Sequence, residues 1–372
     1  MQFKDVVGHT QLKKDLIREI VHDKVSHAQL FMGKSGHGSL PMALAFTQFL
    51  FCENKGESDS CGSCPSCLKV QDLQHPDLHF SFPSVLALSK VSSGFYTEWR
   101  EQLKESAYFD LNHWIDRIDS KGRRPLIGTD ESLEIIKKLA LKSYEGGMKV
   151  MIIWSANEMN TTAANKLLKI LEEPPKDTLF LLVSESDENM LQTILSRTQL
   201  VKIPKISTED LSAFLKEKHG LNSSNADSIA ARSEGDLIEA VEFVTNSDND
   251  NEERELFISL MRVCYKKDVL EMLSWAEKMG SQSREKQKTF LKYALHMFRQ
   301  SMLKNYTDEV LLRVSDDEMN FLKNFSKFIS GNNILDFMKT FNDGHYYVER
   351  NANSKLLFTN ICFQVMRYIH VA

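Results

Sequence analysis

Five short apolar runs, separated by helical patterns, place the strongest constraint on the fold of this chain. They lie at residues 29–33, 78–82, 149–154, 179–184 and 199–204. Three of the runs are apolar almost throughout, which is typical of parallel strands covered by helices on both faces. The alternation of strand and helix therefore predicts an α/β domain with a mostly parallel sheet over residues 1–205.

Two features of this region stand apart from the alternation. The helical pattern TAANKLLKILEE meets Pro174 and Pro175, which should end that helix cleanly. The segment 86–124 is amphipathic and carries several aromatic residues. We interpret it as an insertion between sheet elements, without assigned chemistry.

The chain after the fifth run reads as helical. Residues 206–246 carry helix signals broken by Gly220 and Gly235, enough for a small helical domain. Residues 247–253, SDNDNEE, read as a polar, acidic linker. Residues 254–372 are amphipathic helix throughout and predict a third domain, rich in Phe, Leu and Met, as the main surface for partners. A length of 372 residues suits two or three domains.

Charge and hydropathy limit the classes of function. The net charge of −5 and pI near 6.2 argue against a protein that binds nucleic acid through bulk charge. The chain has no apolar run long enough to span a membrane and its start lacks a secretory pattern, so we expect a cytoplasmic protein. One modest basic group surrounds a helix expected near Asp130, and we slightly prefer a solvated helix face over a DNA contact for it. Its members are Lys121, Arg123, Arg124, Lys137 and Lys138.

Residues 33–40 have the glycine spacing of a phosphate-binding loop without its chemistry. Four residues separate Gly33 from Gly38, with Gly36 among them, and such loops let backbone N–H groups wrap a phosphate. The next two positions should be a Lys for the phosphates and a Ser or Thr for Mg²⁺. They are Ser39 and Leu40. Taken alone, the pattern favours a glycine turn that never bound a nucleotide.

The acidic half of an ATPase site is also missing. An Asp-Glu pair should follow a buried strand, to hold Mg²⁺ and polarise the attacking water. The strand at 149–154 ends instead in Trp154, followed by Ser155. We therefore expect no hydrolysis of ATP by this chain, and its binding of ATP is doubtful.

Four cysteines fall in a C-x8-C-x2-C-x2-C pattern, at Cys52, Cys61, Cys64 and Cys67. Four thiolates at this spacing predict a closed, structural zinc site over about residues 52–67. An iron–sulfur cluster is the chemical competitor. The downstream His75 and His79 are expected to pack rather than to ligate, and the isolated Cys264 and Cys362 to act as small hydrophobic residues.

Several stretches of the first 205 residues together resemble one family. They are SHAQLFMG (26–33), the cysteine cluster, HPDL (75–78), YEGGMKVMII (144–153), AANKLLKILEEPP (163–175), TLFLLVSES (178–186) and TILSRTQLVKIP (193–204). In this order and spacing they resemble the delta-prime subunits of the bacterial sliding-clamp loader, with the tau/gamma subunits as a sister group. Beyond residue 245 the likeness is only to a helical domain of suitable length.

The resemblance implies an AAA+ P-loop-type domain, a small helical lid and an all-α C-terminal oligomerisation domain that joins a collar of five subunits. The implied partners are the tau/gamma and delta subunits and, through the complex, the sliding clamp and primer-template DNA. It also implies that Arg197 is an arginine finger acting on a neighbour's ATP, worth about 10³–10⁵ in rate. The family motif is Ser-Arg-Cys, and Thr198 departs from it. Without the resemblance, Arg197 would be interpreted as a surface arginine.

Other positions of the family pattern are lost in this chain. The lid helix, at 235–240, offers Ile238 and Glu239 where nucleotide-binding members place an arginine. Ser184 holds the place of a polar sensor without a phosphate to sense. The favoured hypothesis is a non-hydrolysing clamp-loader subunit, and the runner-up is an ATP-hydrolysing tau/gamma-type subunit. A zinc-dependent nucleic-acid-binding module is disfavoured by the acidic net charge.

Overall fold

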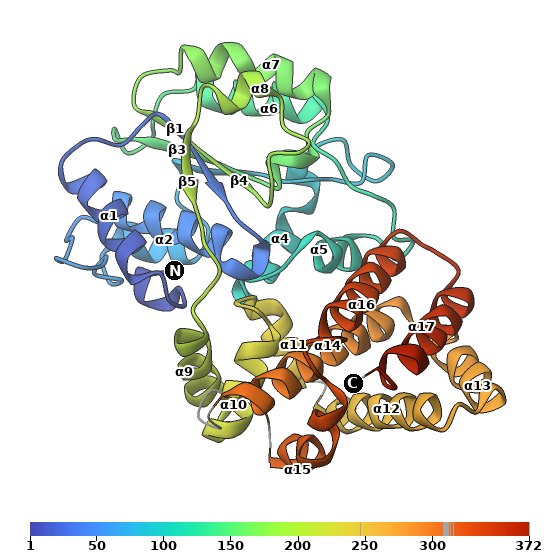
Figure 1. Cartoon of the computed structure of the whole chain (residues 1–372). Coiled ribbons are helices and arrows are strands. Elements are labelled where there is room, and N and C mark those ends of the chain that lie inside the picture. Colours follow the sequence, from blue (N-terminus) through green and yellow to red (C-terminus); the bar gives the residue numbers. More distant parts are fainter. Residues whose placement is uncertain (246, 308–311, 313, 315, 372) are drawn as a thin grey trace. The chain divides into compact units, whose positions relative to one another are not determined.

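The computed structural model describes residues 1–245, 247–307, 312, 314 and 316–371, and it contains the expected sheet (Figure 1). The five strands are β1 (Ala28–Met32), β2 (Leu78–Ser81), β3 (Lys149–Trp154), β4 (Thr178–Ser184) and β5 (Gln199–Lys202). Their order across the sheet is β2-β3-β4-β1-β5, and every neighbouring pair is parallel. The five predicted strands and the parallel sheet are confirmed.

Alternate residues of each strand face opposite layers of helices. Phe31, Ile152 and Leu181 pack in one core, with helices α1 (Thr10–Val21) and α2 (Ser39–Phe51). Their neighbours along the strands pack in a second core on the other face of the sheet, with α6 (Thr129–Ala140), α7 (Thr161–Glu172) and α8 (Gln192–Leu195) (Figure 1). The central strands β1, β3 and β4 are therefore buried on both faces, which explains why they are apolar almost throughout, whereas the edge strand β5 exposes three of its four residues.

The predicted insertion is helical and belongs to the core. It contains η3 (Ser92–Phe95), α4 (Tyr96–Glu105) and α5 (Leu111–Ile118). Trp99 and Trp114 are fully buried, and both rings pack on Phe82, which follows β2. The remaining short elements of the first 205 residues lie outside the insertion. They are η1 (Phe3–Asp5), η2 (Ser35–His37), α3 (Pro65–Gln71) and η4 (Ala156–Glu158).

After β5 the described residues form helices and connecting loops. The elements are α9 (Thr208–His219), α10 (Ser223–Arg232), α11 (Leu237–Thr245), α12 (Ser247–Lys266), α13 (Val269–Gly280), α14 (Arg284–Tyr306), α15 (Asp316–Phe325), η6 (Ser326–Phe328), α16 (Ile334–Glu349) and α17 (Ser354–Tyr368). Gly220 and Gly235 lie just after α9 and shortly after α10, with φ of 66° and 88°. This left-handed backbone favours glycine and explains the breaks in the pattern. None of the described helices combines the length and apolar composition needed to span a membrane.

Two compact units make up the chain: residues 1–211 with 235–239, and residues 212–234 with 240–372. Unit 1 contains the sheet and its two cores. Unit 2 has a core of its own, formed mainly by α12 to α17 around Phe257, Phe298 and Phe341. The division into three domains at 1–205, 206–246 and 254–372 stays a prediction.

The linker predicted at residues 247–253 was wrong, because α12 begins at Ser247. Acidic residues are stabilising in the first turns of a helix, where they face the positive end of its dipole. The same composition therefore suits a linker and a helix start. Glu253 also pairs with Arg232 at 2.9 Å, and both side chains are buried, so this segment is anchored in unit 2.

Candidate functional site: a closed phosphate loop, a cysteine cluster and an exposed arginine

The glycine loop forms as the sequence predicts, but the two residues at the positions that should carry its chemistry, Ser39 and Leu40, are buried. Gly33 follows β1, and a Cβ atom there would lie 2.4 Å from the carbonyl oxygen of Ile203, so no larger residue fits. Gly38 has a φ of 95° and begins α2. Ser39 is buried, and its hydroxyl donates to the Gly33 carbonyl at 2.9 Å. Leu40 is buried in the core. Neither side chain is presented to a nucleotide.

Carboxylates of the same unit occupy the loop where a phosphate would be expected. The backbone N–H and the hydroxyl of Ser35 both donate to Oε1 of Glu185, at 3.1 and 2.5 Å. Asp236 lies directly against Gly36, because a Cβ atom at Gly36 would fall 1.7 Å from its Oδ1. The same oxygen accepts the N–H groups of Ile238 and Glu239, at 3.0 and 3.2 Å, and so begins α11. A phosphate here would meet negative charge.

Aromatic residues fill the space where the acidic half of an ATPase site would lie. Trp154 is 2% exposed and packs on Phe109, with ring centroids 4.8 Å apart. The cavity left at the loop measures about 10 Å³, which is about the room that a single water molecule needs. It is lined by Gly33, Ser35, Ser39, Leu40, Phe109, Trp154, Ser155, Val183, Ser184 and Glu185. The structure thus brings together the degenerate positions that the sequence singled out.

Tyr108 closes the loop from the insertion side. Its hydroxyl accepts the N–H of Val7 at 3.0 Å, and a Cβ atom at Gly38 would lie 3.1 Å from the same oxygen. Burial raises the pKa of this hydroxyl. The sequence analysis did not identify Tyr108, Phe109, Glu185 and Asp236 as parts of the loop. Asp236 is the one with a local signal, since an Asp after a glycine and before an apolar run is a typical helix start.

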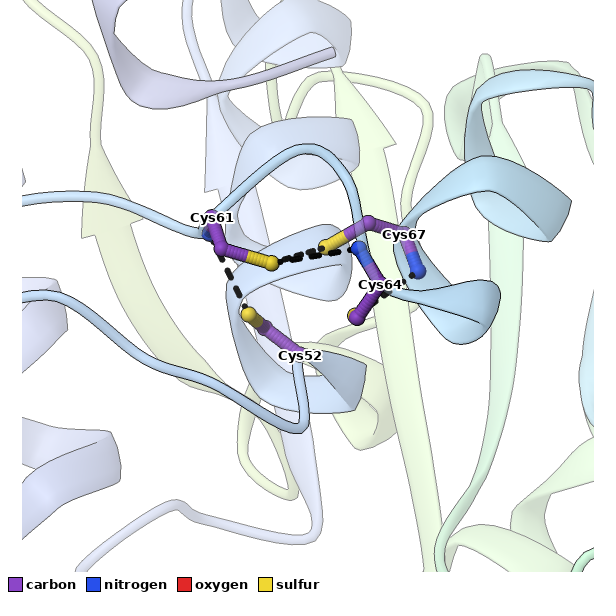
Figure 2. A group of neighbouring side chains, drawn as sticks. All are labelled: Cys52, Cys61, Cys64 and Cys67. Carbon is purple, nitrogen blue, oxygen red and sulfur yellow. Dashed lines mark hydrogen bonds between the residues drawn. The ribbon is translucent and has the colours of Figure 1, made fainter.

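The four clustered cysteines lie together beside unit 1's core (Figure 2). Their sulfur atoms all lie within 4.8 Å of one another, and no other such group occurs among the residues that the structure describes. Backbone N–H groups of Cys61, Cys64 and Cys67 donate to the sulfurs of Cys52, Cys61 and Cys64 at 3.2–3.4 Å. Such bonds stabilise thiolates, so the cluster can bind a metal ion.

Electrostatics differ among the four thiols. Backbone N–H groups of Ser63 and Cys64 lower the pKa of Cys61 to about 6. Burial raises the pKa of Cys52 and of Cys67, which a bound cation would offset. All six cysteines are free thiols, and Cys264 and Cys362 are buried, as expected.

His75 lies beside the cluster and joins it to the segment before β3. Its ring stacks on Phe51 at 4.1 Å, and Nε2 lies 3.1 Å from the Ser66 hydroxyl and 3.2 Å from a carboxylate oxygen of Glu145. Burial lowers its pKa. These contacts agree with the packing role expected for His75.

Arg197 lies at the surface, in the turn between α8 and β5. Its side chain is 31% exposed and lines an open groove of about 660 Å³. Glu172, at the end of α7, accepts from Nε at 2.6 Å and also from Nη2. Two of the five residues of the expected basic group are neutralised, because Arg123 pairs with Asp119 and Arg124 with Glu158.

The chain is similar to subunits of DNA polymerase III. A family model described as "DNA polymerase III, delta subunit" matches residues 8–207, more than half of the chain. The delta-prime subunit of Bacillus subtilis is 30% identical over 257 residues, covering 69% of this chain and 65% of the relative. The delta-prime subunit of Haemophilus influenzae is 28% identical, with 68% and 65% covered. The matched region thus spans slightly less than two thirds of these relatives.

More distant similarity extends to other subunits. The tau subunit of B. subtilis is 26% identical over 56% of this chain and 30% of its own. A solved Thermotoga maritima protein related to the gamma subunit overlaps 96% of this chain and 99% of its own, with 16% identity and a TM-score of 0.39. On the strength of the family match over residues 8–207, this chain belongs to the delta-prime family of DNA polymerase III clamp-loader subunits.

Proposed function

We propose that this chain is a non-hydrolysing subunit of the replicative clamp loader, which helps to load the sliding clamp onto primed DNA. In this proposal Arg197 acts as an arginine finger on ATP held by a neighbouring subunit. The neighbours would be tau/gamma and delta subunits in a five-subunit ring, working in the cytoplasm. Contacts with the clamp and with primer-template DNA would be made through the complex.

The closed phosphate loop is the observation that supports a non-hydrolysing subunit. A cavity of about 10 Å³ is far smaller than a nucleoside triphosphate, and Glu185 already accepts the Ser35 N–H. Trp154 and Leu40 supply no metal ligand, and Ser39 has no positive charge to offset a triphosphate. Every one of these features disfavours binding of MgATP by this chain.

The exposed position of Arg197 supports its proposed role as an arginine finger. Its guanidinium lies beside an open groove, and an arginine there can reach a phosphate presented by another subunit. An arginine finger neutralises the charge that develops on the transferred phosphate. We propose in addition that the metal of the cysteine cluster is a structural Zn²⁺, bound by Cys52, Cys61, Cys64 and Cys67 in a closed site.

The test is Arg197→Ala in the reconstituted loader, with ATP hydrolysis measured in the presence of clamp and primed DNA. We expect a clear loss of stimulated turnover, because the neighbouring site loses about 10³-fold or more in rate. Arg124→Ala is the control, since Arg124 is also an exposed, paired arginine of unit 1. Normal stimulated turnover in the Arg197 variant would refute the finger role.

The alternative is an ATP-hydrolysing subunit of the tau/gamma type. It would require Lys and Thr at positions 39 and 40 and Asp-Glu at 154 and 155, where this chain has Ser39, Leu40, Trp154 and Ser155. The isolated chain separates the two functions. We expect no ATP turnover from it, and turnover at an ordinary enzymatic rate would favour the alternative.

A further inference from the structure

The guanidinium of Arg197 is held from two sides by its own chain. Nε and Nη2 both donate to Oε1 of Glu172. Nη1 donates to the carbonyl oxygen of Thr193 at 2.8 Å and to the hydroxyl of Ser196 at 3.3 Å. A guanidinium has five N–H donors, and these four bonds leave one of them, on Nη2, for an incoming oxygen.

Glu172 is a well-anchored partner in an unusual place. It is the last residue of α7, where the negative end of the helix dipole disfavours a carboxylate. Pro174 and Pro175 follow, so the helix cannot extend and its last turn has a defined end. Leu167 and Leu171 are buried in the core and fix this end of α7 against the sheet. The Arg197 cation offsets the unfavourable position of the Glu172 carboxylate.

Both side chains line the same open groove. Its walls come from the end of α7, from the turn after α8 and from His27, whose Nε2 lies 3.0 Å from the carbonyl oxygen of Leu171. Glu172 and Arg197 are 46% and 31% exposed. Ion pairs at this exposure are weak and screened by water, so a phosphate that enters the groove can take over part of the guanidinium.

We propose that Glu172 is the positioning residue for Arg197. It fixes the direction of the guanidinium before a neighbour's phosphate arrives, and it neutralises the charge of the arginine in the free chain. This inference rests on the proposed finger role. A group that only orients a charge acting in the transition state affects kcat rather than KM. Glu172 should therefore influence how fast the neighbour turns over ATP, and not how tightly it binds ATP.

The matched pair Glu172→Ala and Glu173→Ala tests the inference in the reconstituted loader. Both residues are exposed carboxylates at the same helix end, and the Glu173 side chain makes no hydrogen bond or ion pair within the described part of the chain. We expect Glu172→Ala to lower the stimulated kcat about two- to fivefold, as expected for loss of an exposed ion pair. KM for ATP should be unchanged, and Glu173→Ala should behave as wild type.

Two further variants separate positioning from structural damage. Glu172→Gln keeps an oxygen that can accept from Nε, so it should recover part of the lost kcat. In an Arg197→Ala background, Glu172→Ala should have no additional effect, because nothing is left to position. An additional loss in that background, or a change in KM alone, would overturn the inference.

The outcomes also distinguish this inference from the proposed function. If Arg197→Ala abolishes stimulated turnover while Glu172→Ala matches Glu173→Ala, the finger stands and the positioning role fails. A rise of kcat in Glu172→Ala would likewise overturn it, since Glu172 would then be only a competitor of the phosphate. If Arg197→Ala retains normal turnover, the proposed function itself fails.

Discussion

Truncation of Phe109 is the most direct test of how the phosphate loop is closed. The ring is 2% exposed and packs on Trp154 at 4.8 Å and on Trp99 at 5.7 Å. Phe→Ala in a core costs about 3–5 kcal/mol of unfolding free energy. Within that total, each aromatic ring pair that is lost accounts for roughly 0.5–1.5 kcal/mol. The new void would join the existing cavity beside Glu185, an exposed residue, so water can enter and reduce the cost. We therefore expect about 3 kcal/mol.

The tryptophans provide the assay. Trp99, Trp114 and Trp154 lie together in unit 1, and the fourth, Trp275, lies in unit 2. In a Trp275→Phe background, indole fluorescence during urea unfolding reports on unit 1, next to Phe109. Tyr144→Ala is the control, because that side chain is 84% exposed and its loss should change stability by less than about 0.5 kcal/mol.

The expected result is a lower urea midpoint at an unchanged slope, which marks a loss of stability without a change in the surface exposed on unfolding. A free energy within about 1 kcal/mol of the parent would refute the reasoning. It would mean that Phe109 is not part of the core, and that the loop is open in solution.

Four further expectations follow from the same structure. Purified chain should contain about one zinc per molecule, and Cys61→Ser should lower both the metal content and the thermal midpoint; visible absorbance from iron–sulfur charge transfer would contradict the zinc assignment. Burial lowers the pKa of His9, His37, His75 and His79 below 6.5. The unfolded chain therefore takes up protons first, so the stability of unit 1 should fall as pH drops below about 6.5; His79→Gln should flatten this dependence between pH 7 and 5, and an unchanged slope would argue against it. Glu253→Gln should destabilise unit 2 by about 3 kcal/mol, because the buried Arg232 cation loses its ion pair with the Glu253 carboxylate; the fluorescence of Trp275 should report the loss, and wild-type stability would contradict a contribution from this pair. Glu185→Ala should cost about 0.5–1.5 kcal/mol in the unit 1 assay, since the Ser35 N–H loses its acceptor; no measurable change would show that this bond contributes nothing.

Local sequence patterns predicted most of the fold, but they did not predict that the phosphate loop is closed. Runs of apolar residues identified the central strands, because strands covered by helices on both sides are apolar on both faces. The cysteine spacing identified four side chains whose sulfurs do lie together. The segment 247–253 misled because acidic residues suit both linkers and helix starts. Phe109 and Glu185 could not be placed, since their contacts with Trp154 and Ser35 depend on the packing of segments far apart in the chain.

At Trp154 a single side chain both removes a possible metal ligand and fills the pocket. The indole replaces a carboxylate that would hold Mg²⁺, and the same ring packs on Trp99, Phe109 and Trp114 in the core. Leu40, which lines the same cavity, stands where a metal ligand would be expected and is itself buried in that core. Restoring Lys and Thr at positions 39 and 40 would therefore place polar groups against a hydrophobic core that still fills the pocket. An ATP site could return only if the aromatic residues of the insertion were withdrawn as well, which would cost unit 1 much of its packing. The closure of the loop is thus coupled to the stability of unit 1, and in our proposal the charge that acts on a phosphate lies elsewhere, at Arg197.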